Sequence, residues 1–232
     1  MTSARDQVMA RVRRATRAAE RSPEAEGALA ARLADPPRGI RPARAQLPPA
    51  ALLELFQSMA REVSASVVRV GDAGEVPSEV ARYLKQENLA PRLRMAPDPA
   101  LEALGWAAHP LLEVETGPAR EADQVSLTGA FAGIAETGTL VLLSGPKGPT
   151  TLNFLPETHL VVLDAAAVVG AYEDVWARLR AAYGPGQMPR TVNMITGPSR
   201  TGDIEQTIQL GAHGPRRLHI ILVGKTPEDT GY

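Results

Sequence analysis

The sequence predicts an α/β fold, in which a mostly parallel sheet carries helices on both faces and follows an N-terminal helical arm. Two runs that are apolar almost throughout, SVVRV at 66–70 and HLVVLD at 159–164, alternate with stretches of helical periodicity. Strands without a polar face are typical of a sheet that is covered on both sides. Sheets of this kind have right-handed crossovers, and their ligands lie beyond the carboxyl ends of the strands.

Length and charge restrict the number of domains and the classes of partner that the chain can have. The 232 residues suffice for one large α/β domain or two small ones, and the net charge of −1 favours neither nucleic acid nor an anionic membrane as a partner. The charge is uneven, because residues 1–46 hold ten arginines against five acids and the remainder is acidic. A basic arm of this kind docks on a partner or on the body, or it is simply a solvated helix.

The chain contains no cysteine, which excludes disulfides, a cysteine nucleophile, thiolate zinc sites and cysteine-ligated iron–sulfur clusters within it. No apolar run is long enough for a transmembrane helix. The N-terminus lacks the apolar segment of a secretory signal, so a cytoplasmic location is expected.

Residues 3–34 predict two helices. Ser22-Pro23-Glu24 marks the start of the second one, with serine as the N-cap, proline in the first turn and an acid beside it. The Pro- and Arg-rich stretch 35–49 reads as an extended linker. We therefore expect an arm with its linker at 1–46 and an α/β domain at 47–232.

The first half of this domain opens with a helix over 52–63, because its apolar residues recur at helical spacing. Ser78 is the expected N-cap of a second helix that runs to about residue 88. The expected strands of this half lie at 66–70, 93–96 and 111–115.

The second half carries most of the predicted strands. Strands at 125–131 and 139–145 are so close in sequence that we expect an antiparallel pair or a tight β-loop-β unit. A strand at 159–164 precedes a helix at 171–183, which ends at Gly184. A strand at 191–196, a helix at 203–210 and a strand at 218–224 complete a predicted β-α-β unit.

The loop GIAETGT at 133–139 is the first candidate for chemistry. It is not a phosphate-binding P-loop, because Thr139 stands where that motif needs lysine and a strand follows. The turn presents one carboxylate, Glu136, between Thr137, Gly138 and Thr139. Such a carboxylate acts as a base or nucleophile if its environment tunes it. The alternative is a hairpin turn whose threonines bond the local backbone.

The stretch GPSRTGDIEQ at 197–206 is the second candidate. Read structurally, Ser199 or Thr201 caps a helix whose first turn contains Asp203 and Glu205. Read functionally, Arg200 and free backbone amides bind a carboxylate or phosphate. The two acids compete with such an anion, and both interpretations stay open.

The remaining polar residues predict little chemistry. Pro156 and His159 precede or begin a strand, and one nearby glutamate does not make a metal site, so none is predicted. Lys147 in SGPKGPT reaches a ligand or is a solvated loop tip. Neither a G-x-S-x-G nucleophile elbow nor a G-x-G-x-x-G dinucleotide motif is present.

Three blocks, GIAETGTLVL, LPETHLVVL and ITGPSRTGDIEQTIQLGAHGPRRLHIILV, resemble the signatures of the lactate utilization protein C family (LutC, also called YkgG), which is built on the LUD domain. The resemblance covers roughly residues 50–225. It implies a fold similar to the isomerase and CoA-transferase-like superfamily. It also implies a subunit of a system that oxidises L-lactate to pyruvate, whose cysteine-rich partner subunits carry the iron–sulfur clusters. This chain would then hold no cofactor itself.

The residues in these blocks are candidates for a site by clustering. They are Glu136, Thr137, Gly138, Thr139, Pro156, His159, Thr196, Gly197, Ser199, Arg200, Thr201, Asp203 and Glu205.

Two site-based functions are possible, and the alternative is a scaffold protein without a site. As a subunit of a lactate-oxidising complex, the chain would bind a small carboxylate with Arg200, while Glu136 orients it or moves a proton. As an autonomous CoA-transferase-like or sugar-phosphate-isomerase-like enzyme, it would use Glu136 as nucleophile or base. As a scaffold, it would have no site of its own. Both site-based functions require that the Glu136 and Arg200 turns open into one crevice.

Overall fold

The structure is a computed structural model that describes residues 3–16, 22–184, 186–202 and 209–224. It divides into two units, with the boundary at Gly39–Ile40. The N-terminal unit contains the helices α1 (Ala4–Thr16) and α2 (Pro23–Ala34), whose described side chains are exposed. The Ser22 hydroxyl accepts a hydrogen bond from the Ala25 amide at 3.2 Å, which confirms the predicted N-cap.

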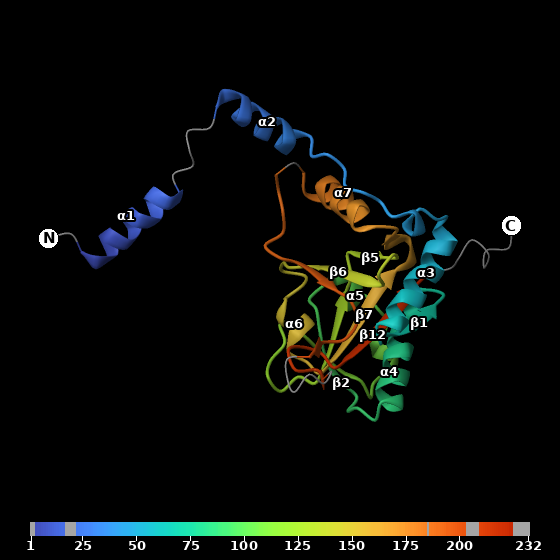
Figure 1. Cartoon of the computed structure of the whole chain (residues 1–232). Coiled ribbons are helices and arrows are strands. Elements are labelled where there is room, and N and C mark those ends of the chain that lie inside the picture. Colours follow the sequence, from blue (N-terminus) through green and yellow to red (C-terminus); the bar gives the residue numbers. More distant parts are fainter. Residues whose placement is uncertain (1–2, 17–21, 185, 203–208, 225–232) are drawn as a thin grey trace. The chain divides into compact units, whose positions relative to one another are not determined.

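The body is built on a six-stranded sheet in which every neighbouring pair is parallel (Figure 1). The order is β1-β12-β7-β4-β2-β3. The strands are β1 (Ser66–Val70), β2 (Arg92–Met95), β3 (Glu113–Thr116), β4 (Val125–Gly129), β7 (Thr158–Asp164) and β12 (Arg217–Val223). The predicted parallel sheet is thus confirmed.

Alternate residues of the central strands face opposite sides of this sheet, which explains why the strands are apolar throughout. Leu160 of β7 and Ile221 of β12 join the core beneath helix α4 (Val76–Gln86). Their sequence neighbours, such as Val161 and Ile220, join the core beneath helix α3 (Pro49–Glu62). The sheet is therefore covered on both faces, as the sequence predicts.

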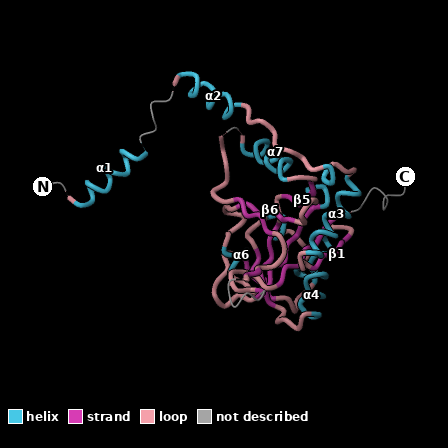
Figure 2. Tube along the Cα trace, viewed as in Figure 1, coloured by secondary structure: helices cyan, strands magenta, loops and turns pink. Residues whose placement is uncertain are grey.

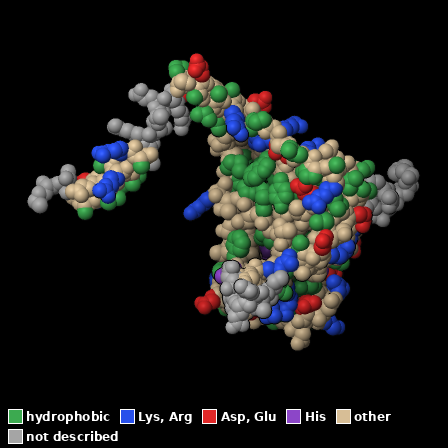
Figure 3. Space-filling model, viewed as in Figure 1, with side chains coloured by type: hydrophobic (Ala, Val, Ile, Leu, Met, Phe, Trp, Pro, Cys, Tyr) green, Lys and Arg blue, Asp and Glu red, His purple; other side chains and the backbone are tan. Residues whose placement is uncertain are grey.

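A second, four-stranded sheet packs on the α3 side, with the order β8-β5-β6-β9 (Figure 2). Its strands are β8 (Val168–Val169), β5 (Ala132–Ile134), β6 (Thr139–Leu143) and β9 (Val192–Ile195). Helix α7 (Tyr172–Tyr183) buries Val175 and Leu179 against this sheet. Hydrophobic side chains also gather on the surface over α7 and these strands (Figure 3).

Short elements complete the body. The strands β10 (Arg200–Thr201) and β11 (Gln209–Leu210) pair antiparallel. Helices α5 (Pro99–Glu102) and α6 (Thr151–Phe154) are each a single turn. Within the described residues, no helix is long and apolar enough to cross a membrane.

The prediction of a β-α-β unit at 191–224 is wrong. Strand β9 pairs antiparallel with β6 in the small sheet, whereas β12 lies in the large one. Gln209–Leu210 is a strand, so the predicted helix does not reach Leu210, and its part at 203–208 lies outside the described residues. The apolar run TVNMI fits either sheet, because strand pairing depends on contacts distant in sequence.

Two further expectations need correction. The strand before β6 that pairs with it antiparallel is the short β5, whereas β4 ends at Gly129 and lies in the six-stranded sheet. Ser78 does not cap its helix, which already begins at Val76. The turn before it is capped by Asp72, whose side chain accepts from the Gly74 amide at 2.7 Å.

Candidate functional site

The two candidate turns, 133–139 and 196–200, meet through threonine hydroxyls. The Thr139 hydroxyl lies 2.6 Å from that of Thr196 and 2.7 Å from that of Thr137. The Tyr172 hydroxyl is 3.0 Å from Thr139 and extends this network to α7. The two turns are therefore neighbours in space, and hydroxyls connect them.

The backbone of both turns packs closely against the C-terminal end of α3. This close approach explains why each turn contains a glycine. Gly138 has a φ of +65°, and a Cβ there would lie 2.3 Å from the Ala60 amide nitrogen. Gly197 has a φ of +73°, and its Cβ would lie 2.3 Å from the Val63 carbonyl oxygen. Only glycine combines a left-handed conformation with so close an approach.

Glu136 is buried, and its carboxylate accepts a hydrogen bond at the N-terminus of a helix. Its carboxylate accepts a hydrogen bond from the Tyr172 amide at 3.3 Å, at the N-terminus of α7. Carboxylates are favoured there because they bond free amides and oppose the helix dipole. Among the described residues, Glu136 forms no ion pair, and it does not line the cavity that contains Arg200.

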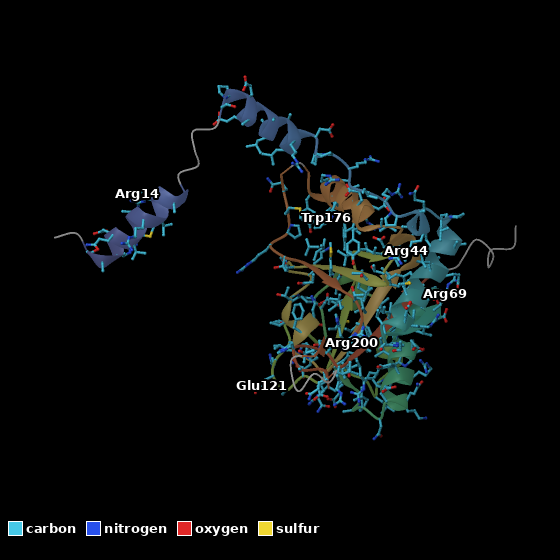
Figure 4. All side chains as sticks on the ribbon, in the orientation of Figure 1. Arg14, Arg44, Arg69, Glu121, Trp176 and Arg200 are labelled. Atoms are coloured by element: carbon cyan, nitrogen blue, oxygen red, sulfur yellow. The ribbon has the colours of Figure 1, made fainter. Side chains whose placement is uncertain are left out.

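Arg200 lies at the opposite kind of helix end. Its guanidinium donates to the Val63 carbonyl oxygen at 3.1 Å, just beyond the C-terminus of α3, where a cation complements the dipole. Arg200 lines a cavity that does not include Glu136, and no hydrogen bond or ion pair joins the two side chains among the described residues. In Figure 4, Arg200 lies near the lower end of the body and Trp176 of α7 near the upper end.

Arg200 also lines a cavity of about 280 Å³, which we call the arginine cavity. Its walls come from α6 and the start of β7 (Phe154, His159), from the 194–200 segment and from the 213–215 turn. Thr196, Gly197 and Ser199 lie in the wall beside Arg200. The structure thus groups five of the predicted site residues around one space.

His159 is the unusual member of this wall. Its side chain is fully buried, its Nε2 lies 2.8 Å from the Thr128 hydroxyl, and its Nδ1 has no hydrogen-bond partner among the described residues. Burial lowers the pKa of His159 to about 3, so the ring is neutral near neutral pH. His159 thus lines the arginine cavity with a ring nitrogen whose hydrogen-bonding capacity is unused among the described residues.

The other candidates have structural positions. The Ser199 hydroxyl accepts a hydrogen bond from the His213 amide at 3.3 Å, and the first turn of the helix that it was expected to cap lies outside the described residues. Thr201 is buried in β10, and Pro156 is buried in the turn before β7 without lining the arginine cavity. Asp203 and Glu205 lie outside the described residues.

The arginine cavity lies at the amino end of the parallel sheet, since it is lined by His159 near the start of β7 and Leu218 near the start of β12. The general rule for such sheets places ligands at the carboxyl ends. A second cavity, of about 460 Å³, lies there and is lined in part by Asp98 and Lys147. Lys147 is a candidate from its Gly/Pro loop, whereas Asp98 is not; the signal that could have marked Asp98 is its position three residues beyond the end of β2.

A second buried histidine, His219, takes part in a hydrogen-bonded group. Its Nδ1 lies 2.8 Å from the Ser66 hydroxyl and its Nε2 lies 3.0 Å from the Glu79 carboxylate, which Arg82 binds through two hydrogen bonds. Burial lowers the pKa of His219 to about 4, although Glu79 opposes this shift. The group therefore fastens α4 to β12.

Within the described ranges, no three His, Asp or Glu side chains gather as metal ligands.

Comparisons with known proteins agree with this architecture. A family model described as the LUD domain matches residues 53–223. The chain is 38% identical over 96 residues to an uncharacterized protein from Neisseria meningitidis serogroup B, covering 41% of the chain and 40% of that protein. It is 34% identical over 104 residues to a lactate utilization protein C from Geobacillus, covering 44% of the chain and 43% of the relative.

A lactate utilization protein C from Halalkalibacterium halodurans is 34% identical over 106 residues, covering 45% of the chain and 46% of that protein. The matches thus span less than half the length of these curated relatives. A crystal structure of a DUF162 family protein from Deinococcus radiodurans has a TM-score of 0.59 and 24% identity, covering 77% of this chain and 99% of that one. This last likeness concerns the fold alone.

Proposed function

Because the chain belongs to the LUD domain family, we propose that it is a subunit of a lactate utilization system and that its arginine cavity binds a small carboxylate. The blocks that match the family include the turn that carries Arg200 and the strand that begins near His159. The relatives named lactate utilization protein C support the choice of lactate or pyruvate as the ligand.

The observation that carries the proposal is the combination of Arg200 and His159 in one cavity. A guanidinium binds a carboxylate through charge-assisted hydrogen bonds, which are stronger than bonds between neutral groups. The unpartnered Nδ1 of the neutral His159 ring supplies a further hydrogen bond for a hydroxyl or keto oxygen beside that carboxylate. A volume of about 280 Å³ suits a small hydroxy or keto acid.

In this proposal the electron-transfer groups belong to partner subunits. The chain has no cysteine, so it offers no thiolate for an iron–sulfur cluster. Its own part is to hold the small acid, and cysteine-rich partners carry the clusters. The exposed helices α1 and α2 suit contact with such partners.

The CoA-transferase-like and isomerase-like alternatives have less support. Both need Glu136 to reach a substrate as nucleophile or base. Its side chain is buried and accepts a hydrogen bond at the start of α7, outside the arginine cavity. A scaffold without a site leaves the unpartnered ring nitrogen of His159 unexplained.

Calorimetry with L-lactate and pyruvate tests the proposal on the full chain. We expect the wild type to bind one of them and Arg200→Ala to weaken binding by about ten- to a hundredfold, the loss of one charge-assisted contact. Arg200→Lys should retain part of the affinity, because it keeps the charge but not the two-pronged geometry.

Two matched controls sharpen this test. Arg216→Ala removes a neighbouring exposed arginine that does not line the cavity, and Glu136→Gln removes the other candidate charge; both should bind as the wild type does. Thermal unfolding checks that each variant is folded. Equal affinity of wild type and Arg200→Ala for the acid, or no binding at millimolar concentrations, would contradict the proposal.

A further inference from the structure

The second cavity, which we call the carboxyl-edge cavity, lies where two neighbouring strands send their connections in opposite directions. Strands β2 and β4 are adjacent and parallel, but β2 leads to β3 on one side and β4 leads toward β7 on the other. The segment after β2 buries Leu101 in the α4 core, and the segment after β4 buries Leu140 in the α3 core. Divergent connections of this kind open a crevice at the strand ends.

The cavity measures about 460 Å³ and draws its walls from several parts of the chain. Asp98 follows β2, Gly129 ends β4, the 143–148 turn forms one wall and Tyr183 comes from the end of α7. This space does not share a lining residue with the arginine cavity. A ligand here is therefore independent of the proposed carboxylate site.

A tight glycine turn holds one cation at this cavity. The Gly145 and Gly148 backbones bond each other at 3.3 and 3.0 Å, which leaves Lys147 at the exposed tip. A Cβ at Gly148 would lie 2.6 Å from the Leu143 carbonyl oxygen, so the turn requires glycine. The Lys147 ammonium forms no hydrogen bond or ion pair with any residue that the structure describes.

A carboxylate and an aromatic wall complete the site. One oxygen of Asp98 accepts from the Ala100 amide at 3.1 Å, and the other has no donor among the described residues. Phe131 and Tyr183 supply rings, and the Arg178 guanidinium lies over Phe131 at 5.1 Å. Cation, carboxylate and rings thus surround one space.

We infer that the carboxyl-edge cavity binds a nucleoside phosphate. Lys147 binds the phosphate, the free oxygen of Asp98 accepts a hydrogen bond from the ribose hydroxyls, and the base packs against Phe131 and Tyr183. An acid that recognises ribose at a crevice of this kind is a recurrent arrangement in α/β folds. The aromatic wall favours a nucleotide over a sugar phosphate, which has no flat apolar body.

Calorimetry on the full chain with ADP, ribose 5-phosphate and inorganic phosphate tests this inference. We expect ADP to bind, and to bind more tightly than the other two probes. Lys147→Glu should weaken ADP binding about tenfold or more, because it reverses the charge at the phosphate. Lys85→Glu, a charge reversal at an exposed lysine on α4, is the matched control and should leave ADP binding unchanged.

Asp98→Asn gives a second, independent readout. An asparagine still caps α5, but it removes the charged acceptor for ribose hydroxyls. The wild type should prefer ADP over its 2′,3′-dideoxy analogue, and the variant should lose this preference.

Arg200→Ala should bind ADP as the wild type does, so the failure of one site is distinguishable from failure of the other. No ADP binding at millimolar concentrations, or equal binding by the wild type and Lys147→Glu, would overturn the inference. Tighter binding of ribose 5-phosphate than of ADP would overturn the nucleotide class.

Discussion

Burial disfavours the charged form of the His159 ring. The pKa of His159 falls to about 3, and the pKa of His219 falls to about 4. An unfolded histidine has a pKa near 6.5. Between these values the unfolded chain binds protons that the folded chain excludes, so folding loses stability as the pH falls below about 6.5.

We therefore expect the free energy of unfolding to decrease between pH 6.5 and 5, by up to about 1.4 kcal/mol per pH unit for each of the two histidines. Urea unfolding at several pH values in this range measures the slope. His159→Gln should reduce the slope by about one histidine's share, because glutamine does not titrate. Identical slopes for variant and wild type would show that the His159 ring is protonated equally in both states. The pKa values of Glu79 and Asp123 are lowered, so their contributions disappear only at more acidic pH.

At the scale of single residues, the sequence names candidate side chains, but it does not show what they contact in the folded chain. Two of these candidates, Thr139 and Thr196, bond through their hydroxyls, because β6 begins and β9 ends at that edge of the small sheet. The functional interpretation of the sequence assigns a carboxylate ligand to Arg200, and the orientation or proton transfer of that ligand to Glu136. In the structure each side chain bonds a backbone group at a different helix end. Tertiary packing decides which helix end each side chain contacts, and the local sequence does not predict it.

At the scale of elements, the last turns of α3 depend on the two glycine turns packed against them. Gly138→Ala introduces a methyl group 2.3 Å from the Ala60 amide nitrogen, at a φ of +65°. We expect a loss of about 2–4 kcal/mol in the free energy of unfolding, from overpacking and backbone strain together.

Gly105→Ala is the matched control, because nothing lies within 4 Å of its added methyl group and its φ is −68°. This variant should stay within about 0.5 kcal/mol of the wild type. Urea unfolding of both variants gives the comparison, and equal stability of the two would contradict the packing described for α3.

The individual strands could be predicted from the sequence, whereas their distribution between two sheets could not. The runs of β6, β7 and β9 are all mostly apolar, although β6 and β9 lie in the small sheet and β7 lies in the large one. Hydropathy therefore identifies a strand without identifying its partner. The carboxyl-edge cavity was missed for the same reason, since it follows from the adjacency of β2 and β4.

At the scale of the whole molecule, the predicted boundary at residue 46 is open to a direct test. Residues just before it contact the body: Arg41 pairs with Asp174 at 3.1 Å, and Ala45 is buried with its carbonyl oxygen against Gly170. We propose that the folded body begins near Ile40, ahead of the predicted boundary.

Deletion of residues 1–39 should leave the melting temperature within about 2 °C of the full chain, whereas deletion of residues 1–46 should lower it by about 4–8 °C, equivalent to roughly 2 kcal/mol. Scanning calorimetry of the two truncated chains gives the comparison. Equal melting temperatures would place the boundary at 46 after all. Co-purification with cysteine-rich partners reports separately on the arm, and loss of the partners after deletion of 1–39 would favour α1 and α2 as the contact.

Strand β12 lies between β1 and β7, although it is the last of the six to leave the ribosome. Strands β7, β4, β2 and β3 are neighbours in the sheet and can pair on the nascent chain before β12 is made. Strand β1 pairs only with β12 in this sheet, so it has no partner there until residues 217–223 emerge. A newly made chain therefore carries a bare strand edge at β1 once residue 70 has emerged, and a second one at β7 once residue 164 has emerged. Chaperones would have to shield these edges until β12 is complete.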